Sequence, residues 1–239
     1  MDLRYLAKVP AFAIIIAAEY ITFRPPNPTP KNVARDKFCE PMLITLTARL
    51  YPLLGVVVNP CLHLCEVATV LAREFPSPLS DRVLAALLTH PANAHNLAIS
   101  PTFLVGLLLI VLGAAWRKRC YDALGRFFTF QLALHKEHKL VTTGPYAIVR
   151  HPSYTAFLMT DLGCLMTLML PGSYVYESGI LQTSWVAVCV ALWGAVLVGL
   201  GLAAVKRARV EDAVLREEFG SEWDAWARKT QYALIPYVY

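Results

Sequence analysis

The chain has 239 residues, of which 56% are hydrophobic and 16% are charged, and its formal net charge is +5. Soluble domains carry about 25% charged residues, so this composition excludes an ordinary soluble domain and indicates an integral membrane protein. The basic residues gather between apolar segments and form no stripe interleaved with aromatic residues, which argues against nucleic-acid binding.

Apolar segments long enough for transmembrane helices, which need about 20 residues, follow one another along the chain. We expect five of them, at about 4–23, 42–71, 101–116, 152–170 and 183–205. Pro52 and Pro60 are expected to kink the second segment. The predicted fold class is an all-α, polytopic transmembrane helix bundle. It forms a single membrane-embedded domain over residues 1–239, with the N-terminal spans and connections in 1–116.

The connections differ in charge, which predicts their orientation. Lys and Arg occur in the 24–41 and 117–151 connections and in the C-terminal tail, whereas the 90–100 and 171–182 connections have neither. Basic connections favour the cytosolic side of a membrane. Residues 206–229 then alternate charged and apolar residues at helical spacing, with a break near Gly220. This pattern predicts an amphipathic helical region on the cytosolic face.

A dense polar stretch at 138–154 separates two apolar regions and ends in Arg-His-Pro-Ser-Tyr. His151 precedes a proline and should be extended, and Pro152 is favoured as the first residue of a helix. We therefore expect unpaired backbone N–H groups at Ser153 and Tyr154, where a carboxylate or phosphate could bind. Ordinary helix capping at the membrane surface is the alternative interpretation.

Two other features of this region bear on binding. The sequence Thr-Thr-Gly-Pro-Tyr predicts a tight turn that presents Tyr146. His135 and His138 have the helical spacing of a metal-binding pair, but no acidic residue or cysteine is suitably spaced to complete a site, so we expect no metal. The six cysteines form no CxxC pair and are interpreted as small buried hydrophobic residues.

Arg207 and Glu211 follow the fifth apolar segment and share one face of a helix. They could form a surface salt bridge, which contributes little to stability. Alternatively, Arg207 grips a carboxylate in bidentate fashion while Glu211 accepts hydrogen bonds from a ligand hydroxyl or ammonium group. Asp161, inside the fourth segment, either lines a cavity or pairs with a neighbouring helix.

Together these residues resemble the isoprenylcysteine carboxyl methyltransferase family. The resemblance rests on segments 138–146 and 150–154 and, in the tail, on Arg207, Glu211-Asp212, Phe219-Gly220 and Glu222-Trp223. It covers about 131–236. The chain departs from the family pattern at Asp212, where a second glutamate is usual, and in having about five spans where animal members have eight.

The resemblance implies a multi-span enzyme of the endoplasmic reticulum membrane with its active site facing the cytosol. Such an enzyme transfers a methyl group from S-adenosylmethionine, leaving S-adenosylhomocysteine, to the C-terminal carboxylate of a prenylated cysteine in CaaX-processed proteins. Its expected partners are prenylated protein C-termini and membrane lipids, with no metal and no nucleic acid. The family has no Rossmann domain, and this sequence shows no glycine-rich βα turn.

Carried over by position, the resemblance makes residues 117–239 the cofactor-binding core. The residues expected to contact the cofactor are Gln131, His138, Lys139, Leu140, Val141, Tyr146, His151, Pro152, Ser153, Tyr154 and Glu211. Arg207 is expected to hold the substrate carboxylate and is the catalytic candidate.

Three alternatives are weighed against this function. A phospholipid amine N-methyltransferase of the same superfamily would need a route for the amine protons and would have less use for an arginine clamp. A sterol-type membrane reductase would need more cationic groups for the additional phosphates of a nicotinamide cofactor. A non-catalytic lipid-binding protein would leave the polar stretch at 131–154 unexplained.

Overall fold

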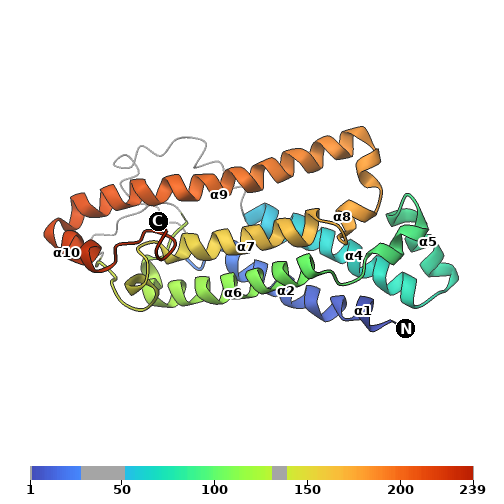
Figure 1. The fold of residues 1–239 in the computed structure, drawn as a ribbon, viewed down its shortest axis with the longest axis horizontal. Helices are drawn as coiled ribbons and strands as arrows, with labels where there is room; N and C mark the ends of the chain where they lie inside the picture. The colour runs from blue at the N-terminus through green and yellow to red at the C-terminus, as the bar shows by residue number, and fades with distance from the viewer. Residues whose placement is uncertain (1, 28–51, 131–138, 239) are drawn as a thin grey trace.

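The computed structural model describes residues 2–27, 52–130 and 139–238. Every regular element in these residues is a helix, so the prediction of an all-α fold is confirmed. The molecule is elongated, and five long helices run along its length (Figure 1). These are α2 (Lys8–Phe23), α4 (Asn59–Glu74), α6 (Pro101–Leu124), α7 (Pro152–Met169) and α9 (Ser184–Phe219).

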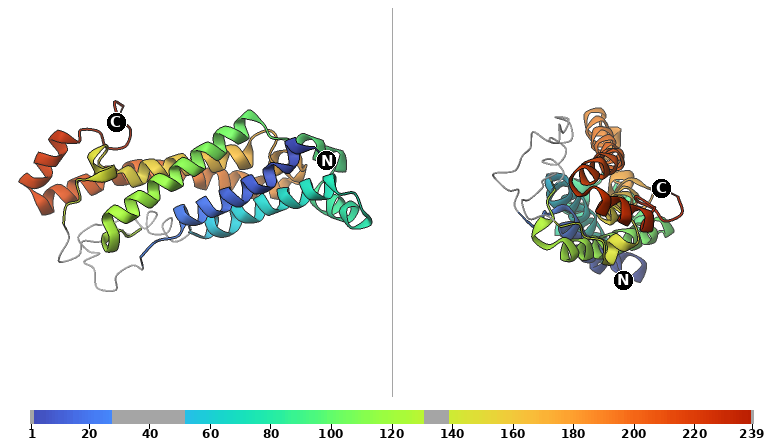
Figure 2. Two further views of the ribbon diagram at one scale, coloured as in Figure 1. Left: turned by 90° about the horizontal axis from the view of Figure 1, so that it is seen from below. Right: turned by 90° about the vertical axis from the view of Figure 1, so that its left-hand side faces the viewer.

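Shorter elements precede, connect and follow the long helices. They are α1 (Leu3–Leu6), α5 (Pro78–Leu87), α8 (Tyr174–Glu177) and α10 (Ser221–Lys229), with 3₁₀ turns at Pro91–Asn96, Gly125–Phe127, Gly144–Ala147 and Ile180–Gln182. A π-helical segment, Leu54–Val58, interrupts the helix between Pro52 and Pro60, where a kink was expected. Helices α5 and α10 mark opposite ends of the bundle (Figures 1 and 2).

Four segments of the described chain are long and apolar enough to cross a membrane, which makes this a multi-pass membrane protein. They are Leu3–Phe23, Gly55–Glu74, Pro152–Glu177 and Ser184–Phe219. These match the first, second, fourth and fifth predicted spans, except that residues 42–51 lie outside the described chain. The third predicted span falls in α6, which is not among the four. The apolar part of α6 stops before Arg117 and is therefore shorter than the about 20 residues that a span needs.

Helix α9 contains both the fifth predicted span and the first part of the predicted helical tail. It continues without interruption for 36 residues, so the charged stretch 206–219 prolongs the axis of the apolar stretch (Figure 1). No glycine or proline lies between 202 and 219 to stop it. The predicted break near Gly220 is confirmed, because this residue has φ +52° and separates α9 from α10.

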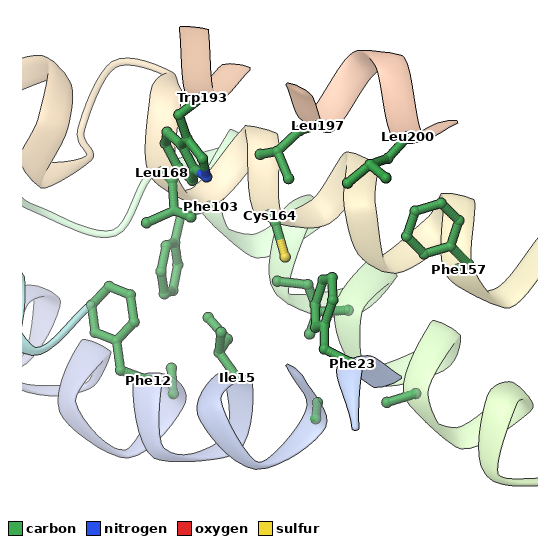
Figure 3. Packing of buried hydrophobic residues seen from close by; sticks show 14 of the residues in the cluster. Phe12, Ile15, Phe23, Phe103, Phe157, Cys164, Leu168, Trp193, Leu197 and Leu200 are labelled. Atoms are coloured by element: carbon green, nitrogen blue, oxygen red, sulfur yellow. The ribbon is translucent and has the colours of Figure 1, made fainter. Parts of the chain in front are cut away.

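Helices α6 and α7 approach each other closely through small residues. A Cβ atom on Gly163 would lie only 2.7 Å from the carbonyl oxygen of Gly106, and one on Gly106 only 3.0 Å from that of Gly163. Such contacts let membrane helices pack backbone to backbone. The apolar core lies between α2, α6, α7 and α9 and includes Phe12, Ile15, Phe103, Phe157, Leu168, Leu197 and Leu200 (Figure 3).

Candidate functional site

The site is built around the first turn of α7. Pro152 is the first residue of this helix, as predicted, and His151 before it is 4% exposed. The expectation of two unpaired N–H groups is wrong for Tyr154, whose backbone N–H donates to the His151 carbonyl at 3.0 Å. The first turn is tightened by an i→i+3 hydrogen bond, which satisfies a donor that would otherwise face a ligand.

Arg117, near the end of α6, holds this turn in place. Its Nη1 donates to the Ser153 carbonyl oxygen at 2.8 Å and to the Ser153 hydroxyl at 3.0 Å. Its Nε donates to the Thr22 carbonyl at 3.0 Å, at the end of α2. A single buried guanidinium therefore ties the start of α7 to both α2 and α6.

Asp212 of α9 binds the two residues that precede α7. Its Oδ1 lies 2.8 Å from Nε2 of His151, and its Oδ2 accepts from Arg150 Nη2 at 3.0 Å. Nη1 of Arg150 also donates to the Thr230 carbonyl at 3.0 Å. Because charge-assisted hydrogen bonds are strong and directional, this network fixes the His151 ring and the α7 start against α9.

Glu211, the neighbour of Asp212, faces the same turn. Its Oε2 accepts from the Tyr154 hydroxyl at 2.8 Å and lies 3.8 Å from Nδ1 of His151. The Glu211 side chain is 28% exposed, so a ligand can reach the carboxylate from outside the protein. The carboxylate acts only as an acceptor when ionised, which suits a ligand that carries hydroxyl or ammonium donors.

Tyr146 lies in a second buried cluster beside these carboxylates, and the turn predicted to present it is the 3₁₀ turn Gly144–Ala147. Gly144 has φ +62°, which favours glycine. Burial, together with the nearby Cys120 thiol and Glu211 carboxylate, raises the pKa of Tyr146 well above its ordinary value. The phenol therefore stays neutral and can donate a hydrogen bond. Leu140 and Val141 pack against the same cluster.

Residues 230–234, here called the C-terminal strap, cross the start of α7. The Arg150 N–H donates to the Tyr232 carbonyl at 2.9 Å, and the His151 N–H to the Ala233 carbonyl at 2.8 Å. The Thr155 hydroxyl donates to the Leu234 carbonyl at 2.6 Å. The strap satisfies backbone donors that would be orphaned in front of a helix, and so completes one wall of the site.

The structure brings together most residues that the sequence assigned to this site. His151, Pro152, Ser153, Tyr154 and Glu211 meet at the start of α7, and Tyr146, Leu140 and Val141 adjoin them. Lys139 is exposed. Arg207 lies one turn before Glu211 on α9, and its charge acts on the Tyr154 hydroxyl. Gln131 and His138 lie outside the described residues.

Asp161 lies away from this site. It is 4% exposed, and its Oδ1 has no hydrogen-bond partner in the described chain. Its Oδ2 faces Gly201 of α9, since a Cβ on that glycine would lie 3.4 Å away. Asp161 therefore belongs to the α7–α9 contact.

Two tryptophans at the site were not assigned from the sequence. Trp116 of α6 and Trp223 of α10 pack against the Tyr146 cluster, and both indole N–H groups are buried with no acceptor within the described residues. A tryptophan near the end of a membrane helix is usually an interfacial anchor. Sequence position alone therefore carried no functional signal for Trp116. Within the same described residues, no group of three or more His, Cys, Asp or Glu is arranged to hold a metal ion.

Comparison with known proteins places this geometry in context. Residues 104–214 match the isoprenylcysteine carboxyl methyltransferase family. The predicted resemblance is thereby confirmed, and the matched stretch contains Arg117, the whole start of α7, Arg207 and the two acids of α9. The C-terminal strap and α10 follow the matched stretch.

Individual relatives agree with the family match. The chain is 32% identical over 136 residues to a probable protein-S-isoprenylcysteine O-methyltransferase of rice (Oryza sativa subsp. indica), covering 56% of this chain and 61% of the relative. It is 31% identical over 135 residues to protein-S-isoprenylcysteine O-methyltransferase B of Arabidopsis thaliana, covering 56% and 58%. With the yeast Saccharomyces cerevisiae protein-S-isoprenylcysteine O-methyltransferase, identity is 34% over 84 residues, covering 34% and 35%.

The chain thus spans about three fifths of the length of the plant relatives that it matches. No solved structure matches it.

Proposed function

We propose that this protein transfers a methyl group from S-adenosylmethionine to the C-terminal carboxylate of a prenylated cysteine in CaaX-processed proteins, forming a methyl ester. One observation carries the proposal. Within the stretch that matches the family, Glu211 accepts a hydrogen bond from Tyr154 at 2.8 Å and lies 3.8 Å from His151, at the start of α7. The proposal places the protein in the endoplasmic reticulum membrane, with this site facing the cytosol.

The residues present fit the proposed cofactor. The partly exposed Glu211 carboxylate suits the ammonium group or the ribose hydroxyls, and the two orphaned indole N–H groups, of Trp116 and Trp223, suit acceptors such as ring nitrogens or a carboxylate. Leu140 and Val141 supply apolar surface beside them. When bound, S-adenosylmethionine supplies an activated methyl group on a sulfonium sulfur.

The protein's own residues then have limited chemical work to do. A carboxylate is ionised at neutral pH, so methyl ester formation needs no general base. Arg207 is always charged and would hold the substrate carboxylate without giving up a proton. The packed first turn of α7 and the strap keep the binding groups in fixed positions, so the reacting groups can be aligned at little entropic cost.

A second candidate, phospholipid amine N-methylation, is supported by one specific contact. An amine that is methylated must lose a proton, and an imidazole bonded to a carboxylate is a common proton acceptor. The His151–Asp212 contact of 2.8 Å has this arrangement. Prenylcysteine methylation is preferred because the similar plant proteins carry that activity in their names and because Arg207 adjoins the site.

The test separates the two candidates directly. The purified full chain is incubated with methyl-labelled S-adenosylmethionine and either N-acetyl-S-farnesylcysteine or vesicles that contain phosphatidylethanolamine. The proposal predicts a base-labile methyl ester on the farnesylcysteine, measured as labelled methanol released by alkali. Alkali-stable label that appears only in phosphatidylethanolamine would overturn it in favour of the second candidate.

A further inference from the structure

A second polar cluster lies inside the helix bundle, separate from the candidate site. It consists of Glu19 of α2, Asn59 and His63 of α4, and Cys164 of α7, and each of these side chains is 0% exposed. Oε1 of Glu19 accepts from Asn59 Nδ2 at 3.1 Å and from Cys164 Sγ at 3.1 Å, and it lies 3.4 Å from Nε2 of His63. Three helices therefore meet at a single carboxyl oxygen.

Three other polar atoms of this cluster have no partner among the described residues. Oε2 of Glu19, Oδ1 of Asn59 and Nδ1 of His63 are all buried, and none has a hydrogen-bond partner in the described chain. A buried polar atom without a partner destabilises the fold, and the hydrocarbon around a membrane helix offers no water to relieve it. Three such atoms on adjoining side chains indicate that a hydrogen-bonding molecule belongs between them.

Rearranging the side chains does not remove the deficit. If the Asn59 amide is flipped, Nδ2 takes the place of Oδ1 as the atom without a partner. Oε2 of Glu19 lacks an acceptor if it is protonated and lacks a donor if it is not. Nδ1 of His63 lacks an acceptor when it carries the proton, and it lacks a donor when Nε2 carries the proton. A partner that both donates and accepts satisfies these atoms in every protonation state.

We propose that Glu19, Asn59 and His63 form a binding site for an internal water molecule. Water both donates and accepts, and a buried water typically makes about three hydrogen bonds to otherwise unsatisfied polar groups. This site does not depend on the function proposed above.

The water site would link α2 to α4, and Glu19 connects it to Cys164 of α7. Figure 3 shows Cys164 directed from α7 toward α2, between Ile15 and Phe23. One turn beyond Glu19, the Thr22 carbonyl accepts from Arg117, which also holds Ser153. A bound water would thus stabilise the part of α2 against which the start of α7 is positioned.

The experiment is X-ray radiolytic footprinting of the full chain in lipid nanodiscs, in which irradiated water forms hydroxyl radicals that oxidise nearby side chains. Cys164 and Cys120 are both 0% exposed, but only Cys164 contacts the polar cluster. We expect Cys164 to be oxidised several-fold faster than Cys120. Equal rates at the two cysteines would overturn the proposal.

A pair of variants links the water to the orphaned atoms. Asn59→Leu preserves side-chain volume and removes one of the three, so the oxidation rate of Cys164 should fall to that of Cys120. Thr69→Val is the matched control on α4, because Thr69 is equally buried and donates to the Cys65 carbonyl of its own helix. A Cys164 rate that is unchanged in Asn59→Leu would contradict the assignment. If that variant fails to fold, the comparison of the two cysteines in the unmodified protein still decides.

Discussion

Nε2 of His151 lies 2.8 Å from Oδ1 of Asp212, although the two residues are 61 positions apart in the sequence. The same carboxylate binds Arg150, so one side chain of α9 fixes both residues that lead into α7. Burial opposes ionisation of such a carboxylate, and these two cationic or hydrogen-bonding neighbours offset that cost. Asp212 is therefore one of the residues that fix the position of the α7 start.

Asp212→Asn should weaken cofactor binding by about ten- to a hundredfold. The amide keeps the size of the side chain but loses charge-assisted hydrogen bonds that contribute about 1.5–3 kcal/mol, which frees the His151 ring to turn. Isothermal titration calorimetry with S-adenosylhomocysteine measures the effect. Asp212→Glu is the control, since it keeps the charge and the family usually has glutamate here. An unchanged affinity in Asp212→Asn would contradict a positioning role.

The parts of this site that could be predicted follow local rules. Pro152 begins α7 because proline at the first helical position needs no N–H partner. The strap was not predicted, since its contacts join residues about 80 positions apart through backbone atoms, as in the bond from Arg150 to Tyr232. Backbone hydrogen bonds are independent of side-chain identity, so no sequence motif predicts them.

The continuity of the fifth span with the tail could not be read from charge for a related reason. Charge after Val205 marked the end of the apolar span and an amphipathic helical region was expected after it, but charge alone does not interrupt a helix, and α9 continues to Phe219. The buried cluster around Glu19 could not be predicted from the sequence either, because its members come from three helices whose rotation is set by packing. What the sequence does carry is the local geometry of turns and helix ends.

Glu211→Gln should reduce cofactor affinity by about ten- to a hundredfold, because a neutral amide is a weaker acceptor than a carboxylate and provides no charge for an ammonium group. Tyr154→Phe tests the contact at 2.8 Å between the Tyr154 hydroxyl and Glu211. The two changes should be less than additive in a double-mutant cycle, since one weakens and the other removes the same hydrogen bond. Fully additive losses in calorimetric affinity would show that the pair does not act as a unit.

Arg207→Ala should abolish most methyl transfer while leaving cofactor binding within about threefold of the unmodified protein. The expected reason is the loss of the cation that holds the substrate carboxylate, which a lysine replaces only poorly. The measurement combines labelled transfer to N-acetyl-S-farnesylcysteine with calorimetric titration of S-adenosylhomocysteine. Equal loss of both activities would place Arg207 in the cofactor site instead of the substrate site.

Thr155→Val should loosen the strap without changing the charge of the site. The hydroxyl donates to the Leu234 carbonyl at 2.6 Å, and valine is close to threonine in shape but has no donor. Because the loss leaves a carbonyl unsatisfied, we expect destabilisation by about 1 kcal/mol and faster amide hydrogen exchange at 230–234. Thr102→Val is the control, since Thr102 contacts Ser100 at the start of α6. Unchanged exchange in the strap would show that backbone bonds alone hold it.

The change in stability at alkaline pH should show whether the buried cluster around Tyr146 excludes water. Burial raises the pKa of the Cys120 thiol from 9.0 to about 12. Between these values the unfolded chain releases the proton while the folded chain retains it. The free energy of unfolding therefore falls with rising pH, by up to about 1.4 kcal/mol per pH unit for one group. The stabilising contribution of Cys120 is complete below pH 9 and is lost progressively above it.

Cys120→Ala should make the apparent melting temperature fall less steeply between pH 9 and 11 than in the unmodified protein, even if the variant is less stable throughout. Cys189→Ala, at an exposed position on α9, is the matched control and should leave the slope unchanged. The slope is the informative quantity, since a cavity left by the smaller side chain lowers stability equally at every pH. Parallel melting curves for Cys120→Ala and the unmodified protein across this range would mean that the thiol is not protected from ionisation and that the cluster around Tyr146 is open to water.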